Sequence, residues 1–443
     1  MNKTAPEISM KGSHSFQGLK SKKVELSFTA DEISSDGGLM LIREVDKKLQ
    51  LTKKVASLLP DPRDSSLITH SWQSLLQQRV YGIAAGYEDL NDHQELRNDS
   101  VMQLAVEREE SLGSSATLCR FENSLTRSAL WQIHQLLVDQ WLTSYQTDPD
   151  EIILDFDATD LELHGNQEGK FYHGYYREYC YLPIHVFCGN QLLVSYLKPA
   201  SQDAAKHSWA IFSLLVKRIR LRFPCCKILF RGDSGFCRYR LFEWCEKQEN
   251  VYYLTGIAKN SVLEQKAREW IKESQDRFDE SKEKQRIFGE FQYAAKSWKK
   301  HERRIIVKAE TTSLGKNTRF VITNLGQDSQ LLYDQVYCAR GKMEQSISEQ
   351  MDFFSDRMSS HFFRKNQFRM LLSALAYTLL EAIRSQVLQG TKLERSKCST
   401  IRLLLIKVGT LVIKNTRRIK LICSKNFAYQ DLFFRVLHHF QMT

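Results

Sequence analysis

Three acidic residues, Asp155, Asp157 and Asp160, are closely spaced at the end of an apolar run that begins at Ile152. An apolar run that ends in carboxylates indicates a buried strand whose last residues emerge at a sheet edge. Ligands of open α/β sheets commonly bind beyond the carboxyl ends of the strands. Because Asp is a poor strand former, two interpretations remain open: a strand followed by a solvated acidic turn, or a strand that presents carboxylates to a ligand.

Two further acids complete a set that could perform metal-assisted chemistry. A second apolar run ends at Asp233, and Glu344 lies in a segment, 337–358, whose pattern predicts a helix. Phosphodiester chemistry uses two Mg²⁺ ions about 3.5–4 Å apart, and Mg²⁺ prefers oxygen ligands. Carboxylates brought together would repel and take up protons unless a cation lay between them. Asp157, Asp233 and Glu344 therefore predict a catalytic Mg²⁺ site, with Mn²⁺ as the alternative ion.

Tyr337, Arg340 and Glu344 follow one another at spacings of three and four residues, which places them on one face of the predicted helix. An acid, a guanidinium and an aromatic ring on one face suit contact with a DNA strand, because guanidinium binds phosphate well. The alternative is an ordinary surface ion pair between Arg340 and Glu344, which contributes little.

The elements that must position these residues follow an α/β pattern. Apolar runs predict strands at 152–156, 181–187, 192–197, 227–233 and 251–255, with helices at 203–222 and 240–248. Alternation of strands and helices predicts a sheet covered by helices. By analogy, the order of elements is that of an RNase H-like core.

The chain divides into five predicted segments. The expected fold class is α/β, a mixed sheet flanked by helices, with a β-rich insertion that holds strands at 304–308 and 319–323. The first segment could bind DNA or serve only as a scaffold. The segments are a mostly helical N-terminal domain (1–148), the first part of the core (149–258), the β-rich insertion (259–330), the core helices (331–390) and a basic C-terminal segment (391–443).

Charge and composition restrict the partners. The formal net charge is +11, and residues 391–443 carry eleven Lys and Arg against two acids, a net +9. Such a segment suits a polyanion, first of all nucleic acid, and Arg417 and Arg418 are candidate DNA contacts. The alternative is a basic protein without a nucleic-acid partner. No window is apolar enough for a membrane span, residues 1–6 lack a signal-peptide core, and the ten cysteines form no C-x-x-C pair. We therefore expect a cytoplasmic protein with reduced thiols and no membrane partner.

Taken together, several motifs resemble the DDE transposases of bacterial insertion sequences, in particular the thirteen-eighty group within the broader Y-x-x-R-x-x-x-E class. The resemblance covers nearly the whole chain and rests on the sum of the motifs. They are Leu59-Pro60-Asp61-Pro62-Arg63, Gln78-Arg79-Val80-Tyr81-Gly82-Ile83, Gly86-Tyr87-Glu88-Asp89-Leu90-Asn91-Asp92-His93, Leu118-Cys119-Arg120-Phe121-Glu122-Asn123, Asp157-Ala158-Thr159-Asp160 with His164-Gly165, and Arg231-Gly232-Asp233-Ser234-Gly235-Phe236.

The resemblance implies an RNase H-like catalytic core interrupted by a β-rich insertion. It implies that Asp157, Asp233 and Glu344 are the catalytic and metal-binding acids, and that Tyr337 and Arg340 contact phosphate. The expected activity is cut-and-paste movement of a mobile element, with double-stranded DNA at the element ends and at the target as partner. A homodimer is expected on the DNA ends.

The sequence departs from the class signature at two positions. The signature usually continues to a Lys seven residues after the Glu, where this chain has Met351, and Ser348 stands at an earlier site where a Lys is also expected. The corresponding DNA contact would be lost or moved to Lys342 or Arg357.

Related enzymes stack a flipped base on an aromatic residue of the insertion, and Trp298 is the candidate here. Base–aromatic stacking contributes about 1–3 kcal/mol per base. Trp298 stands between Lys296 and Lys299-Lys300, which suits a DNA contact. An equally weighted interpretation is a tryptophan that only packs in the core of the insertion.

Two other functions remain open. Asp155-x-Asp157-x-Thr159 also resembles the nucleophile loop of haloacid-dehalogenase-type phosphatases, with Asp155 attacking phosphorus and Asp157 as acid and base. No second acid follows Asp233 closely, however, and the basic C-terminal segment has no role in small-phosphate chemistry. The third interpretation, motivated by Met351, is a transposase relic that binds DNA without cleaving it.

Overall fold

The computed structural model describes residues 14–20, 22–298 and 301–442 of the 443-residue chain. Lys299 and Lys300, which follow Trp298, lie outside the described residues.

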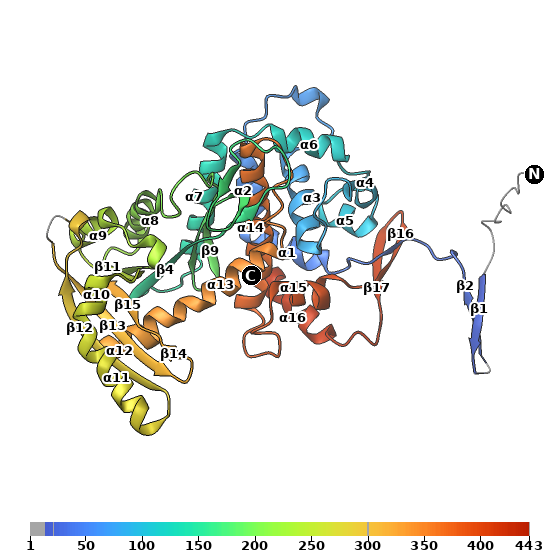
Figure 1. Cartoon of the computed structure of the whole chain (residues 1–443). Helices are drawn as coiled ribbons and strands as arrows, with labels where there is room; N and C mark the ends of the chain where they lie inside the picture. Colours follow the sequence, from blue (N-terminus) through green and yellow to red (C-terminus); the bar gives the residue numbers. More distant parts are fainter. Residues whose placement is uncertain (1–13, 21, 299–300, 443) are drawn as a thin grey trace, which may run out of the picture.

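A nine-stranded mixed sheet runs through one half of the molecule (Figure 1). One strand, β14 (Gly315–Lys316), pairs only with β13. In spatial order the others are β12 (Gln285–Tyr293), β13 (Arg303–Thr312), β15 (Arg319–Thr323), β11 (Val251–Ile257), β10 (Lys227–Gly232), β4 (Glu151–Ala158), β8 (Ile184–Cys188) and β9 (Gln191–Tyr196).

Five of these strands form an RNase H-like core, in the spatial order β9-β8-β4-β10-β11. Strands β4, β8 and β9 pair antiparallel in chain order, as a meander does, whereas β10 is parallel to both β4 and β11. The connections to the parallel strands contain α8 (Ser208–Arg222) and α9 (Tyr239–Glu246). The α/β class and the expected order of strands and helices are confirmed.

Segment 259–330 extends this sheet. After α10 (Ser261–Lys266) and α11 (Arg268–Ser281), strand β15 pairs antiparallel with β11, and β13 and β12 follow outward. The sequence predicted the strands at 304–308 and 319–323 but missed β12. Charged and polar side chains alternate with apolar ones along β12, because only one face of the strand is partly buried. Its composition therefore resembles that of the charged segment around it.

Strand β4 separates its side chains between two faces of the sheet. Ile152, Leu154 and Phe156 belong to the core on the side of α8 and α9. The intervening residues Ile153 and Asp155 therefore face the opposite side, because successive side chains of a strand alternate. Asp157 shares that opposite side, which also receives the segment around Tyr333.

The other half of the molecule is helical and is built around α14 (Phe363–Gln386), which is buried along most of its length. Helix α14 contacts α3 and the edge strand β9, and one apolar core contains residues from 39–137 together with residues from 343–440. The N-terminal helices therefore share their core with the C-terminal segments. They are α1 (Leu39–Leu49), α2 (Leu51–Ser57), α3 (Trp72–Ala85), α4 (His93–Leu96), α5 (Ser100–Ala105), α6 (Ser115–Asn123) and α7 (Arg127–Thr143), and the C-terminal ones are α15 (Cys398–Ile401) and α16 (Gln430–Gln441).

The helix predicted at 337–358 begins earlier than expected, ends at Met351 and changes its helical type along its length. Following α12 (Ser329–Leu331), Leu332–Tyr337 forms a π-helical stretch, Cys338–Arg340 a 3-10 turn, and Gly341–Met351 the α-helix α13. Stretches of π-helix are rare and frequently occur at functional sites.

Smaller β-elements lie outside the main sheet. The hairpin β1 (His14–Leu19) with β2 (Lys22–Leu26) stands away from the body (Figure 1), and β3 (Ile33–Ser34) joins β16 (Thr410–Asn415) and β17 (Arg418–Cys423). A third small sheet contains β5 (Leu161–Glu162), β7 (Glu178–Tyr181) and β6 (Phe171–His173). Among the described residues, no helix is both long and apolar enough to cross a membrane.

Candidate active site

Asp157 and Asp233 lie at adjacent strand ends. Strands β4 and β10 are parallel, and their last paired residues are Phe156 and Gly232. Asp157 directly follows the first of these residues and Asp233 directly follows the second. Oδ1 of Asp157 accepts a hydrogen bond from the Ala158 amide at 2.9 Å, and Oδ1 of Asp233 accepts one from the Gly235 amide at 2.8 Å. These short local bonds fix both carboxylates at the sheet edge.

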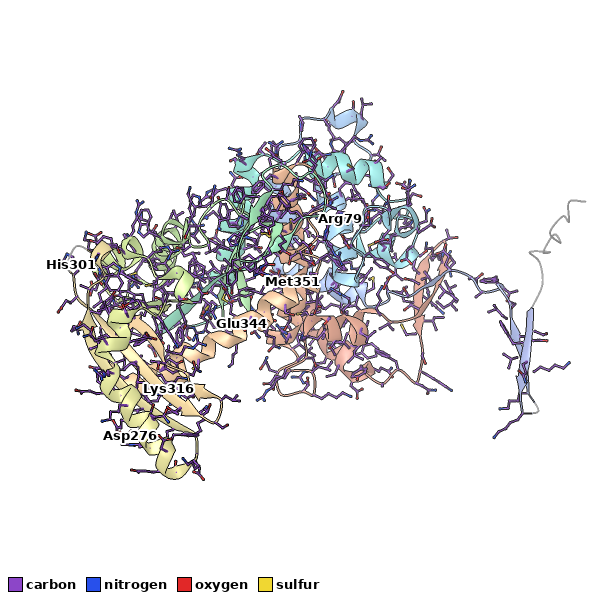
Figure 2. The ribbon with its side chains drawn as sticks, in the orientation of Figure 1. Arg79, Asp276, His301, Lys316, Glu344 and Met351 are labelled. Carbon is purple, nitrogen blue, oxygen red and sulfur yellow. The ribbon has the colours of Figure 1, made fainter. Side chains whose placement is uncertain are left out.

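Arg340 lies between the acids of the strands and the acid of the helix. Its Nη2 is 3.0 Å from Oδ2 of Asp157, and its Nη1 is 3.4 Å from Oε1 of Glu344. Glu344 lies on α13 with its side chain 70% exposed, whereas those of Arg340 and Asp157 are 14% and 13% exposed (Figure 2). The structure thus brings together acids from three distant segments around one guanidinium.

Tyr337 closes the same site from the π-helical stretch. A Cβ atom at Gly256, on β11, would lie 2.7 Å from the Tyr337 hydroxyl, so only glycine allows this close approach. Burial raises the pKa of the phenol, Arg340 lowers it and Asp233 raises it, which places Tyr337 within the field of the same charges. Tyr337, Arg340 and Glu344 therefore lie near Asp157 and Asp233.

The electrostatics of this group are those of acids crowded together. Burial raises the pKa of Asp157 to about 6, Arg340 opposes that rise, and Asp233 and Glu344 add to it. Burial alone would lower the pKa of Arg340, but Asp157 and Asp233 raise it above its ordinary value. The guanidinium supplies the positive charge that the carboxylates require.

The donor set fits a hard divalent cation in its chemistry. Carboxylate oxygens are the ligands that Mg²⁺ prefers, and repulsion between Asp157 and Asp233 is what a cation relieves. In this conformation, within the part of the chain that the structure describes, no three His, Cys, Asp or Glu side chains lie close enough together to hold a metal ion. Arg340 is bound to Asp157, so the site is a candidate metal centre whose present cation is a guanidinium.

Asp155 has a different role. Its two carboxylate oxygens accept hydrogen bonds from Nε and Nη2 of Arg231, at 2.5 and 2.7 Å, and both side chains are almost fully buried. Arg231 also donates to the Val336 carbonyl at 2.6 Å, which ties β10 to the segment that precedes Arg340. With both oxygens engaged, Asp155 is not available as the nucleophile of a phosphatase.

Trp298 lies in a 3-10 turn and is only 4% exposed. Its ring contacts Phe242 and Tyr293, and the guanidinium of Arg303 lies 5.4 Å from the ring centroid. This packing favours the interpretation of Trp298 as a core residue, since a stacked base would have to displace these contacts.

The remaining predicted DNA contacts are distributed over the surface. Lys342 is exposed on α13, two residues after Arg340 in the chain, whereas Met351 packs partly against the apolar core, an environment that suits Met better than Lys. Arg357 is 61% exposed near Glu88. Arg417 and Arg418 are exposed at the turn between β16 and β17, away from the main sheet (Figure 1).

Tyr176 lies near the acids but is not among the site residues that the sequence predicted. Tyr176 lies close enough to Asp157 and Asp160 for both charges to raise its pKa, after the larger effect of burial. It belongs to a stretch, 171–181, in which six of eleven residues are Phe or Tyr. That density of aromatics was the available signal.

Comparison with known proteins identifies the family of this chain. The family model described as "Transposase DDE domain group 1" matches residues 16–443. The chain therefore belongs to this family of DDE transposases.

A search of curated proteins found no match. Among solved structures, the chain is similar to the cryo-EM structure of a piggyBac transposase synaptic complex with hairpin DNA, at 11% sequence identity and a TM-score of 0.43, over 83% of this chain and 79% of that chain.

Proposed function

We propose that this protein is a metal-dependent DNA transposase that cleaves the ends of its mobile element and joins them to target DNA. The observation that carries the proposal is the convergence of Asp157, Asp233 and Glu344, from β4, β10 and α13, around Arg340 in a chain of the DDE transposase family. The motif set further supports assignment to the thirteen-eighty group of insertion-sequence transposases.

Asp157, Asp233 and Glu344 would hold Mg²⁺, or Mn²⁺ in its place. When bound, the metal would activate an attacking oxygen and stabilise the leaving oxygen at phosphorus. Arg340 and Tyr337 would orient the scissile phosphate, because a guanidinium pairs with phosphate as readily as with a carboxylate. Arg340 can therefore exchange its present partner, Asp157, for the substrate.

Double-stranded DNA is the proposed partner, at the element ends and at the target. The C-terminal segment, with Arg417 and Arg418 exposed on a hairpin, would bind backbone, and Lys342 would add a contact beside the acids. We propose a homodimer on the paired ends, acting in the cytoplasm.

The test is nicking of a DNA duplex that carries the sequences flanking the gene, with the full-length protein and Mg²⁺. We expect the wild type to release a 3′-OH at the element end and Asp233→Asn to lose this activity. Asp276→Asn, at an exposed position on α11, is the matched control and should cleave normally (Figure 2). Equal cleavage by Asp233→Asn would overturn the assignment, and specific end binding without any cleavage would favour the relic.

A further inference from the structure

The hairpin of β1 and β2, with the residues that follow it up to Phe28, stands away from the body of the protein (Figure 1). We call residues 14–28 the arm. Val24 and Leu26 are 39% and 46% exposed, and Phe28 is 96% exposed. None of the apolar cores formed by the described residues contains these three side chains. The arm therefore carries apolar surface that its own chain does not cover.

The apolar side chains of the hairpin share one face. Val24 and Leu26 are two residues apart on β2, so they point to the same side. Phe16 is directly opposite Val24 in the pairing of β1 with β2 and adds its ring to that side. A two-stranded hairpin alone is marginally stable in water and needs a further strand or a helix against its apolar face. We therefore expect another protein surface to cover the arm.

A groove of matching character lies between α1, the β16–β17 pair and α16. Its volume is about 540 Å³. Phe434, on α16, is 46% exposed there, so the groove is open to an incoming side chain. Most of the lining is apolar and includes Met40, Val408, Leu421, Phe433, Phe434 and Leu437.

The base of the arm is fixed beside this groove. The Val412 amide donates a hydrogen bond to the Glu32 carbonyl at 2.8 Å, and the Glu32 carboxylate lies 3.0 Å from Nζ of Lys414. Thr410, which lines the groove, pairs with Ser34 of β3. Glu32 is four residues after Phe28, a distance of at most about 14 Å in an extended chain. The arm and the groove therefore adjoin on the same side of the body.

We propose that the arm of one protomer packs in this groove of a second copy, while the second copy's arm packs in the groove of the first. Because arm and groove adjoin, a twofold axis beside β3 brings each arm to the partner's groove, and such reciprocal contacts are typical of symmetric dimers. Within one chain, the fixed base directs the arm away from its own body (Figure 1).

The exchanged surface is large enough for a dimer. A buried aromatic side chain contributes about 150–250 Å². Two such arms, counted together with the surfaces that they cover, reach the roughly 1,200–2,000 Å² of a specific interface. The side chains that each arm would bury are Phe16, Val24, Leu26 and Phe28.

The charges of the arm leave DNA as the competing partner. Lys20, Lys22 and Lys23 are exposed on it and could contact phosphate. Phosphate does not cover an apolar face, however, and for that reason a protein surface is the better partner. The inference gives a surface to the dimer of the proposed function, but it predicts that the dimer forms without DNA and without cleavage.

Cys423, an exposed thiol that lines the groove, allows a direct test in the full-length protein without DNA. Under mild oxidation, Phe28→Cys should join its new thiol to Cys423 of the partner subunit, which gives a covalent dimer on a non-reducing denaturing gel. Adding Cys423→Ser should remove this dimer, and wild type measures the background from the other thiols. A disulfide within one chain, no dimer above background, or a dimer that survives Cys423→Ser would overturn the proposal.

Sedimentation over a concentration series measures the same interface without a cross-link. Leu26→Ser with Phe28→Ser should weaken dimerisation by about 100-fold or more, since both arms lose two buried apolar side chains. Phe434→Ser, in the groove, should also weaken it. Leu314→Ser, 99% exposed at the turn between β13 and β14, is the matched control and should dimerise like wild type. A monomeric wild type, or an arm variant that dimerises normally, would overturn the proposal.

A mixture of the arm variant and the groove variant distinguishes exchange from other contacts. A mixed dimer keeps one intact arm in one intact groove, so the mixture should associate more strongly than either variant alone. No gain on mixing would contradict exchange. Loss of DNA binding by an arm variant that dimerises normally would make the arm a DNA contact instead. If wild type dimerises through the arm but never cleaves DNA in Mg²⁺, this inference stands and the proposed catalysis fails.

Discussion

The carboxylate of Asp157 lies in surroundings that disfavour its negative charge. It is 13% exposed at a strand end, close to Asp233, and Arg340 supplies a compensating charge. A buried carboxylate close to another acid lowers the stability of the fold. The same arrangement favours binding of a cation, because a cation removes the repulsion between the two acids. The site therefore stores unfavourable electrostatics where the proposed metal would relieve them.

The first residue-scale prediction concerns stability. The folded pKa of Asp157, about 6, lies above its ordinary value of 3.8, so its contribution to stability is present at low pH and is lost as the pH rises towards about 6. Asp157→Asn should therefore raise the free energy of unfolding at pH 8 by about 1 to 3 kcal/mol, as measured by urea denaturation. This gain should shrink towards pH 4. Asp276→Asn should show no such pH-dependent gain, and a less stable Asp157→Asn at pH 8 would contradict the prediction.

The second residue-scale prediction concerns the metal. A proton on Asp157 competes with a cation, so Mg²⁺ affinity should fall as the pH drops below about 6. Removing Arg340 takes away the effect that opposes the rise in this pKa. Arg340→Gln should therefore move the fall in affinity to higher pH, as measured by calorimetric titration with Mg²⁺. A pH-independent affinity in both proteins would exclude Asp157 as a ligand.

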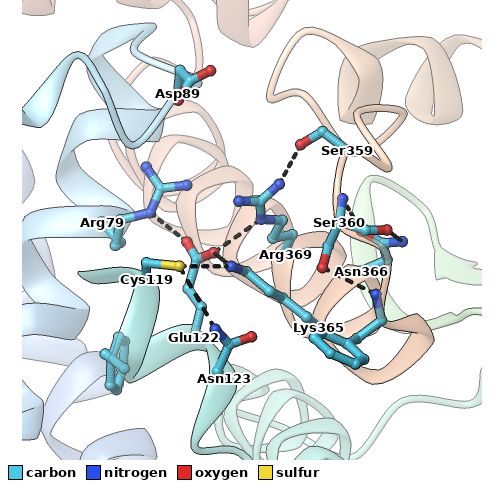
Figure 3. Close-up of polar contacts among 12 residues, drawn as sticks. Arg79, Asp89, Cys119, Glu122, Asn123, Ser359, Ser360, Lys365, Asn366 and Arg369 are labelled. Carbon is cyan, nitrogen blue, oxygen red and sulfur yellow. Dashed lines mark hydrogen bonds and ion pairs between the residues drawn. The ribbon is translucent and has the colours of Figure 1, made fainter. Parts of the chain in front are cut away.

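At the scale of elements, a buried charge network joins α3 and α6 to α14 (Figure 3). The carboxylate of Glu122, fully buried, accepts hydrogen bonds from Nε of Arg79 and Nε of Arg369, both at 2.9 Å, and lies 3.7 Å from Lys365. Burial alone would raise the pKa of Glu122, but these cations lower it below its ordinary value. Arg79 and Glu122 belong to motifs used above for the resemblance, so part of the motif set is structural.

Removing one member of a buried charge network leaves the others uncompensated. Glu122→Gln should therefore destabilise the protein by about 3–5 kcal/mol, because three cations would lose their shared carboxylate. The measurement is urea unfolding, with Glu109→Gln, exposed before α6, as the matched control. A loss of less than about 1 kcal/mol, typical of exposed pairs, would show that the network is not held as described.

At the scale of the whole molecule, the basic C-terminal segment is part of the helical core. Leu405, Val412 and Val436 lie in the same core as the N-terminal helices, while Arg417 and Arg418 stay exposed on the β16–β17 hairpin. The apolar side chains of this segment thus pack in the core, whereas these arginines remain exposed to solvent.

DNA affinity should depend on salt through these exposed cations. Each phosphate contact contributes about −0.9 to the slope of log affinity against log salt, so Arg417→Ala with Arg418→Ala should reduce the slope by about 1 to 2. Binding of element-end duplex across a salt series measures this. Lys316→Ala, exposed on β14 at the far end of the sheet, is the control (Figure 2). A slope equal to that of wild type would remove the hairpin from the DNA interface.

The sequence by itself determined the main strands and helices of the core and the acids at their ends. Apolar runs that end in Asp mark buried strands with polar tips, and both depend only on neighbouring residues. Glu344, Arg340 and Tyr337 were likewise placed on one face by local spacing. Burial is not readable in this way, so the sequence leaves Trp298 open between a stacking and a core residue, and its contacts favour the core.

Only the tertiary structure decided which distant residues meet. Pairing of β15 with β11 extends one sheet through residues 259–330, and the packing of α14 gives N-terminal and C-terminal helices a common core. The same packing engages Asp155 with Arg231, buries Trp298 and brings Tyr176 near Asp157. Charge compensation and burial depend on neighbours that are far away in the sequence, and for that reason the sequence alone does not show them.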